Sequence, residues 1–246
     1  MYKAVVLIKR KRGMSMEDFI DYYENKHIPL ALPRVTNLKR DVRHYIRPFG
    51  NDVYQTDAES PYDVLTEIGF ENEMEFLRGM AMLAEPETAA ILAADEEKLF
   101  ERPSIRFMRM EDRESNLPGA QGGMYKAVVL IKKKRGMSME DFVEYYETKH
   151  APLGLSKVTN LKRYVRHYIR PFGNDVYPAD AASPYDVLTE IGFENEMEFL
   201  RGMAMLTEPE TAAIIAADEE YLFERSSIRF MVMEDRETDF SQAFLQ

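Results

Sequence analysis

Four histidines are the side chains best suited to proton transfer in this chain. They occur in two recurring sequence contexts, one shared by His27 and His150 and the other by His44 and His167. Histidine titrates near neutral pH, so one held against a pocket can take up and return a proton. His27 follows Tyr23 by about one helical turn in a segment whose apolar residues recur every 3.6 residues. That spacing predicts a buried helix face carrying both side chains.

We predict His27 and His150 as the proton-transfer residues. Tyr23 and Tyr146 lie one turn before them and are predicted to donate hydrogen bonds to a developing enolate or phenolate. The alternatives stay open. A histidine at this place could serve only to stabilise the end of a helix, and a tyrosine could serve only as core.

A second set of candidates lies on two predicted strands, where alternate residues point to opposite sides of the sheet. His44 shares one side with Val42 and Ile46, and Arg43 and Tyr45 lie on the other. We predict that this set contacts substrate: His44, His167, Tyr45, Tyr168, Tyr164, Arg43 and Arg166. The competing interpretation is a set of core histidines beside an ion network between sheets, which would also pair the mid-strand charges of Glu67 and Arg106.

Composition excludes several other classes of function. The chain has no Cys, which removes disulfides and thiolate chemistry, and its net charge of −11 disfavours a broad nucleic-acid surface. No His-x-His or His-x-x-x-His pair, Gly-rich phosphate loop or dinucleotide fingerprint occurs, so we expect neither a metal nor an organic cofactor. No stretch approaches the roughly 18 apolar residues of a membrane span. We therefore expect a cytoplasmic protein with no membrane partner.

An internal repeat determines the organisation of the chain. Residues 1–114 match residues 124–237 at all but 17 positions. The repeat predicts two domains, 1–113 and 124–237, joined by a linker at 114–123 and followed by a tail at 238–246. Each unit has a reasonable size for a small domain, so the chain resembles an in-frame fusion of two near-identical reading frames.

Within one copy, strand and helix patterns follow the order β-α-β-β-α-β. Ser15 and Asp18 are spaced like a capping box at the start of the first helix. Helices in this order cover one face of a sheet, so two sheets facing each other would bury the uncovered faces. The predicted α+β fold is two ferredoxin-like (βαββαβ) domains packed sheet to sheet. The expected elements are strands at 2–9, 38–49, 62–70 and 104–112 and helices at 15–30, 71–83 and 86–100.

Several segments resemble the EthD-domain family of dimeric α+β barrels. They are MSMEDFIDYYENKHIPLAL with its His-x-Pro-Leu ending, LKRYVRHYI, YDVLTEIGFEN and AADEEYLF, in that order along the chain. The resemblance covers about 110 residues of each copy. It implies an intrachain dimeric barrel with one pocket per copy between sheet and helices. It also implies relatives that are cofactor-free dehydratases, cyclases or isomerases of aromatic or polyketide-like compounds.

The leading functional hypothesis is therefore a cofactor-independent acid–base enzyme acting on an aromatic or conjugated carbonyl compound. The alternatives are a binding module for a hydrophobic small molecule and a structural pseudo-dimer. The copies differ at Asp41 against Tyr164 and at Lys98 against Tyr221. If these positions line the pockets, the second pocket is more aromatic and binds an aromatic or anionic ligand more tightly.

Overall fold

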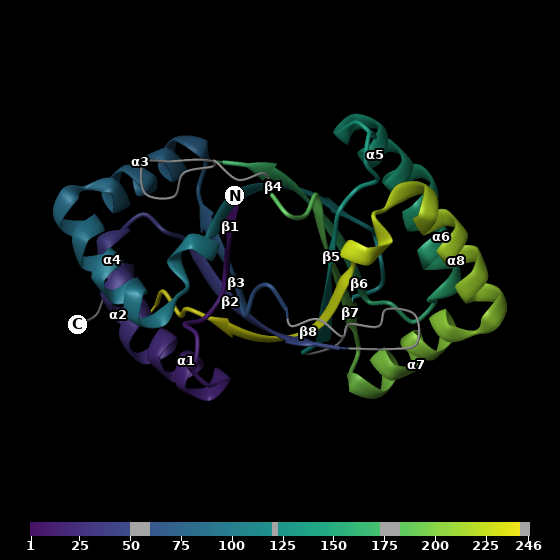
Figure 1. The fold of residues 1–246 in the computed structure, drawn as a ribbon, viewed down its shortest axis with the longest axis horizontal. Coiled ribbons are helices and arrows are strands. Elements are labelled where there is room, and N and C mark those ends of the chain that lie inside the picture. The colour runs from purple at the N-terminus through teal and green to yellow at the C-terminus, as the bar shows by residue number, and fades with distance from the viewer. Residues whose placement is uncertain (50–59, 120–122, 173–182, 242–246) are drawn as a thin grey trace.

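The computed structural model describes residues 1–49, 60–119, 123–172 and 183–241 (Figure 1). Parts of the predicted linker (120–122) and tail (242–246) lie outside the described residues. The strands of the first copy are β1 (Tyr2–Ile8), β2 (Arg40–Pro48), β3 (Val64–Phe70) and β4 (Arg106–Glu114). Those of the second copy are β5 (Tyr125–Ile131), β6 (Arg163–Pro171), β7 (Val187–Phe193) and β8 (Arg229–Glu237).

The helices of the two copies correspond closely, and each copy's first helical segment is interrupted by a π-helical turn. In the first copy they are α1 (Met16–Tyr22), the π turn η1 (Tyr23–His27), α2 (Ile28–Ala31), η2 (Leu32–Arg34), α3 (Glu73–Ala84), α4 (Pro86–Leu99) and η3 (Arg102–Ser104). In the second they are α5 (Met139–Tyr145), the π turn η4 (Tyr146–His150), α6 (Ala151–Lys157), α7 (Glu196–Thr207), α8 (Pro209–Leu222) and η5 (Arg225–Ser227). No helix in the described ranges is long and apolar enough to cross a bilayer.

Local sequence signals account for where the helices begin. The Ser15 hydroxyl accepts a hydrogen bond from the Asp18 backbone N–H at 3.0 Å, as the predicted capping box requires. Asn72 caps α3 in the same way through the Glu75 N–H. Pro86 occupies the first turn of α4, where its missing N–H costs no intrahelical hydrogen bond.

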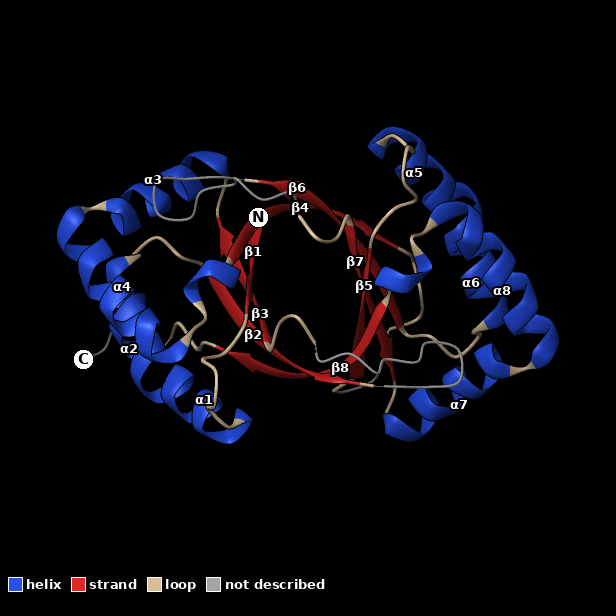
Figure 2. Cartoon of the chain, in the orientation of Figure 1, coloured by secondary structure: helices blue, strands red, loops and turns tan. Residues whose placement is uncertain are grey.

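The eight strands form one closed barrel in the order β1-β3-β2-β8-β5-β7-β6-β4, with every neighbouring pair antiparallel (Figure 2). Within a copy the order is β4-β1-β3-β2, and the copies are joined by β2 with β8 and by β4 with β6. The sequence predicts two sheets that face each other. In the structure the two sheets are also hydrogen-bonded to each other along both edges. Closure leaves no strand edge unpaired.

Strand alternation divides the side chains between the barrel interior and the helix-covered outer face. The helices lie outside the barrel, one set on each side (Figure 2). One end of the barrel interior is filled by an apolar cluster to which both copies contribute. It includes Val5, Leu7, Ile46, Leu65 and Met108 from the first copy, and Val128, Leu130, Ile169, Leu188 and Met231 from the second. This cluster is a core that neither copy can bury alone.

Charged side chains occupy the other end of the interior, where β1 and β2 begin and β3 and β4 end. Lys3 Nζ lies 3.1 Å from Asp112 Oδ2, and Arg40 Nε lies 2.7 Å from Glu67 Oε1. The second copy repeats both pairs, as Lys126 with Asp235 at 2.7 Å and Arg163 with Glu190 at 2.7 Å. Glu67 belongs to the expected ion network. Arg106 instead donates to the carbonyls of Pro103 and Ile105.

His44 and His167 belong to this network and not to a pocket. His44 Nδ1 lies 2.7 Å from Asp235 Oδ1, and His167 Nδ1 lies 2.7 Å from Asp112 Oδ1, so each histidine pairs with the other copy. Burial alone would lower the pKa of His167, but Asp112 and Glu190 raise it to about 9. Burial would likewise raise the pKa of Glu190, but His167, Lys126 and Arg163 hold it well below its ordinary range.

We expect the two copies to stay together when the linker is cut. A protease site in place of residues 120–122 allows cleavage of the folded chain, and native mass spectrometry then measures the mass of the product. The paired edges and the shared interior core, not the linker, hold the copies together, so the cleaved chain should keep the mass of both halves. Two stable, separate monomers would contradict the shared core.

Removing the interior carboxylates should destabilise the barrel. Replacing Glu67 and Glu190 with Leu removes the buried carboxylate shared by an arginine and a lysine in each copy, and leaves these cations only the more exposed carboxylates at the barrel end. Because these cations are a quarter to a third exposed, we expect a loss of about 2–3 kcal/mol per site, below the cost of breaking a fully buried pair. Urea unfolding measures the loss. The surface change Glu17→Gln is the control, and an equal effect of both would place the interior carboxylates in water.

Candidate functional site

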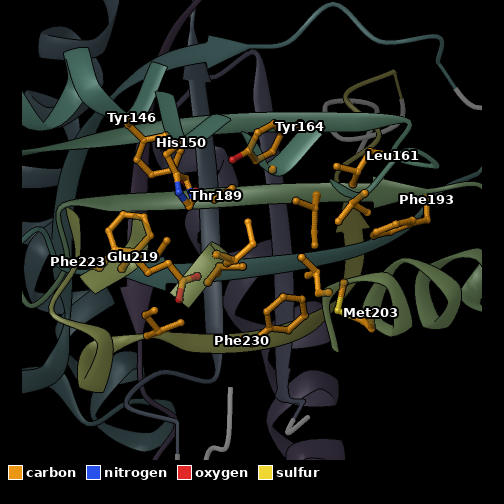
Figure 3. Close-up of a pocket in the computed structure, with 18 residues that line it drawn as sticks. Tyr146, His150, Leu161, Tyr164, Thr189, Phe193, Met203, Glu219, Phe223 and Phe230 are labelled. Carbon is orange, nitrogen blue, oxygen red and sulfur yellow. The ribbon is translucent and has the colours of Figure 1, made fainter. Parts of the chain in front are cut away.

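Each copy contains one cavity between its helices and the outer face of its half of the barrel. The cavity of the first copy has a volume of about 120 Å³ and that of the second about 90 Å³. Their walls are mostly apolar and come from the strands and from the helices that cover them (Figure 3). The few polar side chains in the second cavity are Tyr146, His150, Tyr164, Thr189 and Glu219.

A histidine–aspartate pair lies at each cavity. His27 Nδ1 is 2.8 Å from Asp95 Oδ2, and Tyr22 donates its hydroxyl to the other oxygen, Oδ1, at 2.8 Å. The hydrogen bond from His27 lowers the pKa of Asp95, so the carboxylate is ionised at neutral pH and accepts from Nδ1–H. His27 lines the cavity. Nε2 is then the ring nitrogen left for chemistry.

The second copy reproduces this arrangement. His150 Nδ1 lies 2.6 Å from Asp218 Oδ2, and Tyr145 donates to Oδ1 at 3.0 Å. Burial alone would raise the pKa of Asp218, but the hydrogen bond and the charge of His150 lower it instead. Both aspartates were missed by sequence reasoning. They lie 68 residues from their histidines, and the signal available was the AADEE segment, read only as part of the family resemblance.

A π-helical turn carries both predicted catalytic residues of the first copy, Tyr23 and His27. The Ile28 N–H bonds to the Tyr23 carbonyl, one residue further than in an α-helix. The two rings meet edge to face with centroids 5.0 Å apart, and Phe100 lies 5.2 Å from the His27 ring. The same turn holds Tyr146 and His150 in the second copy. Helical periodicity correctly predicts that each pair shares a face, but it does not predict the wider turn.

The two pocket tyrosines are neutral hydroxyl groups bonded to threonines of the adjacent strand. Tyr23 lies 2.9 Å from Thr66 Oγ1, and Tyr146 lies 2.8 Å from Thr189 Oγ1. Burial raises the pKa of Tyr146 to about 12 and that of Tyr23 also well above its ordinary value. Both therefore keep their proton at neutral pH and can donate a hydrogen bond.

A buried carboxylate in each cavity was also missed. Glu96 lines the first cavity and accepts from Arg102 Nε at 2.9 Å, and Glu219 lines the second and accepts from Arg225 Nε at 3.2 Å. Their place on α4 and α8 puts them on the wall formed by the helices, and Figure 3 shows Glu219 directed into the cavity. The AADEE segment of each copy contains them, but three consecutive acidic residues do not indicate which of the three is buried.

Position 41 and its counterpart 164 line the cavities with different chemistry. Asp41 is 3% exposed and Tyr164 is 6% exposed, and each lines the cavity of its own copy. Tyr221, the other predicted difference, is 58% exposed and packs against the Tyr145 ring outside the cavity. Of these two differences, only Asp41 against Tyr164 reaches the cavity walls.

Four of the predicted substrate contacts lie on the helix side of the sheet but beside the cavities. Tyr45 donates to Glu24 at 2.6 Å, and Arg43 pairs with the same carboxylate at 2.7 Å. Tyr168 and Arg166 repeat the arrangement with Glu147. The structure places none of the four on a cavity wall. With His44 and His167 inside the barrel, only Tyr164 of the predicted substrate-contact set lines a cavity.

Within the described part of the chain, no group of three or more histidine, aspartate or glutamate side chains is arranged to hold a metal ion. Each histidine instead has one carboxylate partner at Nδ1. The arrangement suits proton transfer, in which the carboxylate fixes the ring and stabilises its cationic form.

Comparison with known proteins supports the family and the fold. A family model described as EthD domain matches residues 11–103 and 134–226, which together make up more than half of the chain. A solved anthrone oxidase-like protein is 12% identical, with a TM-score of 0.55 over 96% of this chain and 92% of that one. A monooxygenase-like protein from Fusobacterium nucleatum subsp. nucleatum is 7% identical, with a TM-score of 0.51 over 97% and 94%. No curated protein matches the sequence.

The histidine–aspartate bond can be tested through the titration of Asp95. In His27→Leu the carboxylate loses the hydrogen bond that lowers its pKa most, so the pKa of Asp95 should rise. Carbon-13 NMR of labelled aspartate carboxyls measures the change. Tyr22→Phe removes only the second hydrogen bond and should raise the pKa less. An Asp95 titration that does not respond to His27→Leu would contradict the pairing.

Proposed function

The chain belongs to the EthD-domain family, and we propose that it is an acid–base enzyme that moves a proton next to the carbonyl group of a hydrophobic small molecule. The observation that carries this proposal is the histidine–aspartate pair at each apolar cavity, with Nε2 as the free nitrogen and a neutral tyrosine one turn away. A site of this kind needs no organic cofactor to exchange a proton.

In the proposed reaction, neutral His27 or His150 is the base. Nε2 removes a proton from the carbon adjacent to the carbonyl, and the electrons of the C–H bond form the enolate. The imidazolium that results is stabilised by Asp95 or Asp218, which also fixes the tautomer with the proton on Nδ1. These aspartates act as positioning residues.

The tyrosines stabilise the charge that develops on the carbonyl oxygen. Because the raised pKa keeps Tyr146 protonated, its hydroxyl donates a hydrogen bond and does not compete as a base. The imidazolium then returns its proton. Return to a different carbon is an isomerisation, whereas transfer to a hydroxyl group on the β carbon releases water and is a dehydration.

The cavities limit the size of the ligand. An apolar cavity of about 150 Å³ binds benzene, so at about 120 and 90 Å³ the cavities hold at most one ring, and only when lining side chains shift to enlarge them. A larger polyketide-like substrate would require the helices to move apart. The walls favour apolar and aromatic groups, with polar contacts confined to the end that carries histidine, tyrosine and threonine.

We also propose that each half of the barrel is one ferredoxin-like βαββαβ unit, with residues 1–113 and 124–237 as the two domains. The strand order β4-β1-β3-β2 in each copy supports this proposal. So do the last strands, which end at Glu114 and Glu237.

The function is tested with deuterium exchange at the methyl group of acetophenone in D₂O, followed by proton NMR. The chain should accelerate exchange, and His27→Ala with His150→Ala should reduce it about 100-fold or more. Free imidazole should partly restore the rate by entering the space left by the ring. Asp95→Asn with Asp218→Asn should lower kcat more than it changes KM.

The paired control is Asp21→Asn, an exposed change on the same helix as the first site. Binding of acetophenone without any catalysed exchange would favour the alternative, a binding module in which the histidine only orients the ligand. Exchange that survives the double alanine variant would reject histidine as the base.

A further inference from the structure

We propose that the two cavities select different ligands and that residue 41 or 164 sets the difference. The cavity of the first copy takes an aromatic ligand carrying a positive charge, such as an arylalkylammonium ion. That of the second takes a neutral or anionic aromatic ligand. This inference rests on the proposed function only in requiring that the cavities bind small molecules.

Few of the 17 differences between the copies reach the cavity walls. The positions that line at least one cavity and differ in type are Ile28 against Ala151, Ala31 against Gly154, Leu92 against Ile215, and Asp41 against Tyr164. The first three exchange one small or aliphatic residue for another. Only Asp41 against Tyr164 changes the charge of a wall.

Asp41 gives the first cavity an excess of negative charge. Its Oδ2 lies 3.0 Å from Arg43 Nη1 and accepts from the Thr238 hydroxyl at 2.9 Å. Burial raises the pKa of Asp41 above its ordinary value, and Arg43 and Thr238 oppose that shift only in part. Arg43 also pairs with Glu24. Two carboxyl groups therefore share one guanidinium, and the group carries a formal charge of −1 when both are ionised.

The matching group in the second copy is neutral. Arg166 pairs with Glu147 alone, and the formal charges cancel. The Tyr164 ring replaces the carboxylate and lies under the Arg166 guanidinium, 4.7 Å from its carbon. Figure 3 shows the Tyr164 hydroxyl directed toward the end of the cavity that holds His150. The wall thus offers an aromatic face and a neutral hydroxyl to a ligand.

Each wall is completed by the segment that follows the last strand of the other copy. Thr238, after β8, donates to the Asp41 carboxylate and accepts from Arg43 Nη1 at 2.6 Å. Ser115, after β4, accepts from Arg166 Nη1 at 2.7 Å, and its N–H bonds to the Tyr164 carbonyl. Both copies thus place a hydroxyl group beside the arginine. Thr238 also bonds to the Asp41 carboxylate, whereas Ser115 has no carboxylate at position 164 to bond to.

Two methionines allow each cavity to be observed separately in the full chain. Met80 lines the first cavity and Met203 the second. With carbon-13 methyl-labelled methionine, the two signals are assigned from Met80→Leu and Met203→Leu. Titration with benzylamine, benzoate and benzyl alcohol then gives the affinity of each cavity for a cationic, an anionic and a neutral aromatic probe.

We expect benzylamine to shift the Met80 signal at roughly tenfold lower concentration than the Met203 signal, and benzoate to show the opposite order, because one buried charge separates the walls. Asp41→Asn should remove the preference at Met80, and Asp41→Tyr should reproduce the Met203 pattern. Asp21→Asn, an exposed carboxylate on α1, should change neither.

Two failures can be told apart. If both methionine signals respond to the three probes in the same order, or if Asp41→Asn leaves the Met80 preference intact, the difference in selectivity is rejected while the cavities stand as binding sites. If none of the probes, including benzyl alcohol, shifts either signal at millimolar concentration, the cavities do not bind small aromatic molecules, and the proposed function fails with the inference. Unchanged thermal unfolding of each variant verifies that its fold is retained.

Discussion

Edge pairing between the two copies is the interaction on which the rest of the structure depends. A four-stranded sheet covered by helices on one side has two unpaired edges and one exposed apolar face. Pairing β2 with β8 and β4 with β6 satisfies both edges and encloses both faces in one step. The same pairings bring Ser115 and Thr238 onto the strands that carry the cavity walls. Barrel closure therefore also shapes the candidate sites.

Closure imposes a strict requirement on charge inside the barrel. Charged residues near the ends of four strands in each copy meet at one end of the interior, where each must find an opposite charge. The pairs satisfy this requirement largely across the copies, since His44 pairs with Asp235 and His167 with Asp112. His27 and His150 lie outside the barrel, on the helical turns that cover the outer face of the sheet. Each copy thus contributes one histidine to a pair between the copies inside the barrel and one to a pair within the copy at a cavity.

The sequence contains enough information for the fold but only part of the site. The repeat, the strand alternation and the helical period predict the elements, the tandem copies and the shared face of Tyr23 and His27. Alternation also separates His44 from Tyr45 correctly. Alternation does not indicate which side of the strand faces the helices. For that reason the prediction of His44 as a substrate contact was wrong, and its side chain lies inside the barrel. Asp95 escaped prediction because the contact that matters joins residues 68 positions apart, and only packing brings them together.

Fusion of the copies changes what the two sites can become. In a barrel made of identical chains, every substitution in one pocket appears in the other, so a wall charge would be present twice or not at all. Here the His, Asp, Tyr and Thr of the proton-transfer group are retained in both copies, whereas position 41 differs from position 164. The residues that would perform the chemistry have their partners within their own copy, on η1, α4 and β3 in the first. The wall that differs is completed by the other copy. A single chain can therefore keep one chemistry while its two binding surfaces diverge. The two wall residues, and the two hydroxyl groups that support the walls, are separate positions of the chain, so a substitution in one wall leaves the other unchanged.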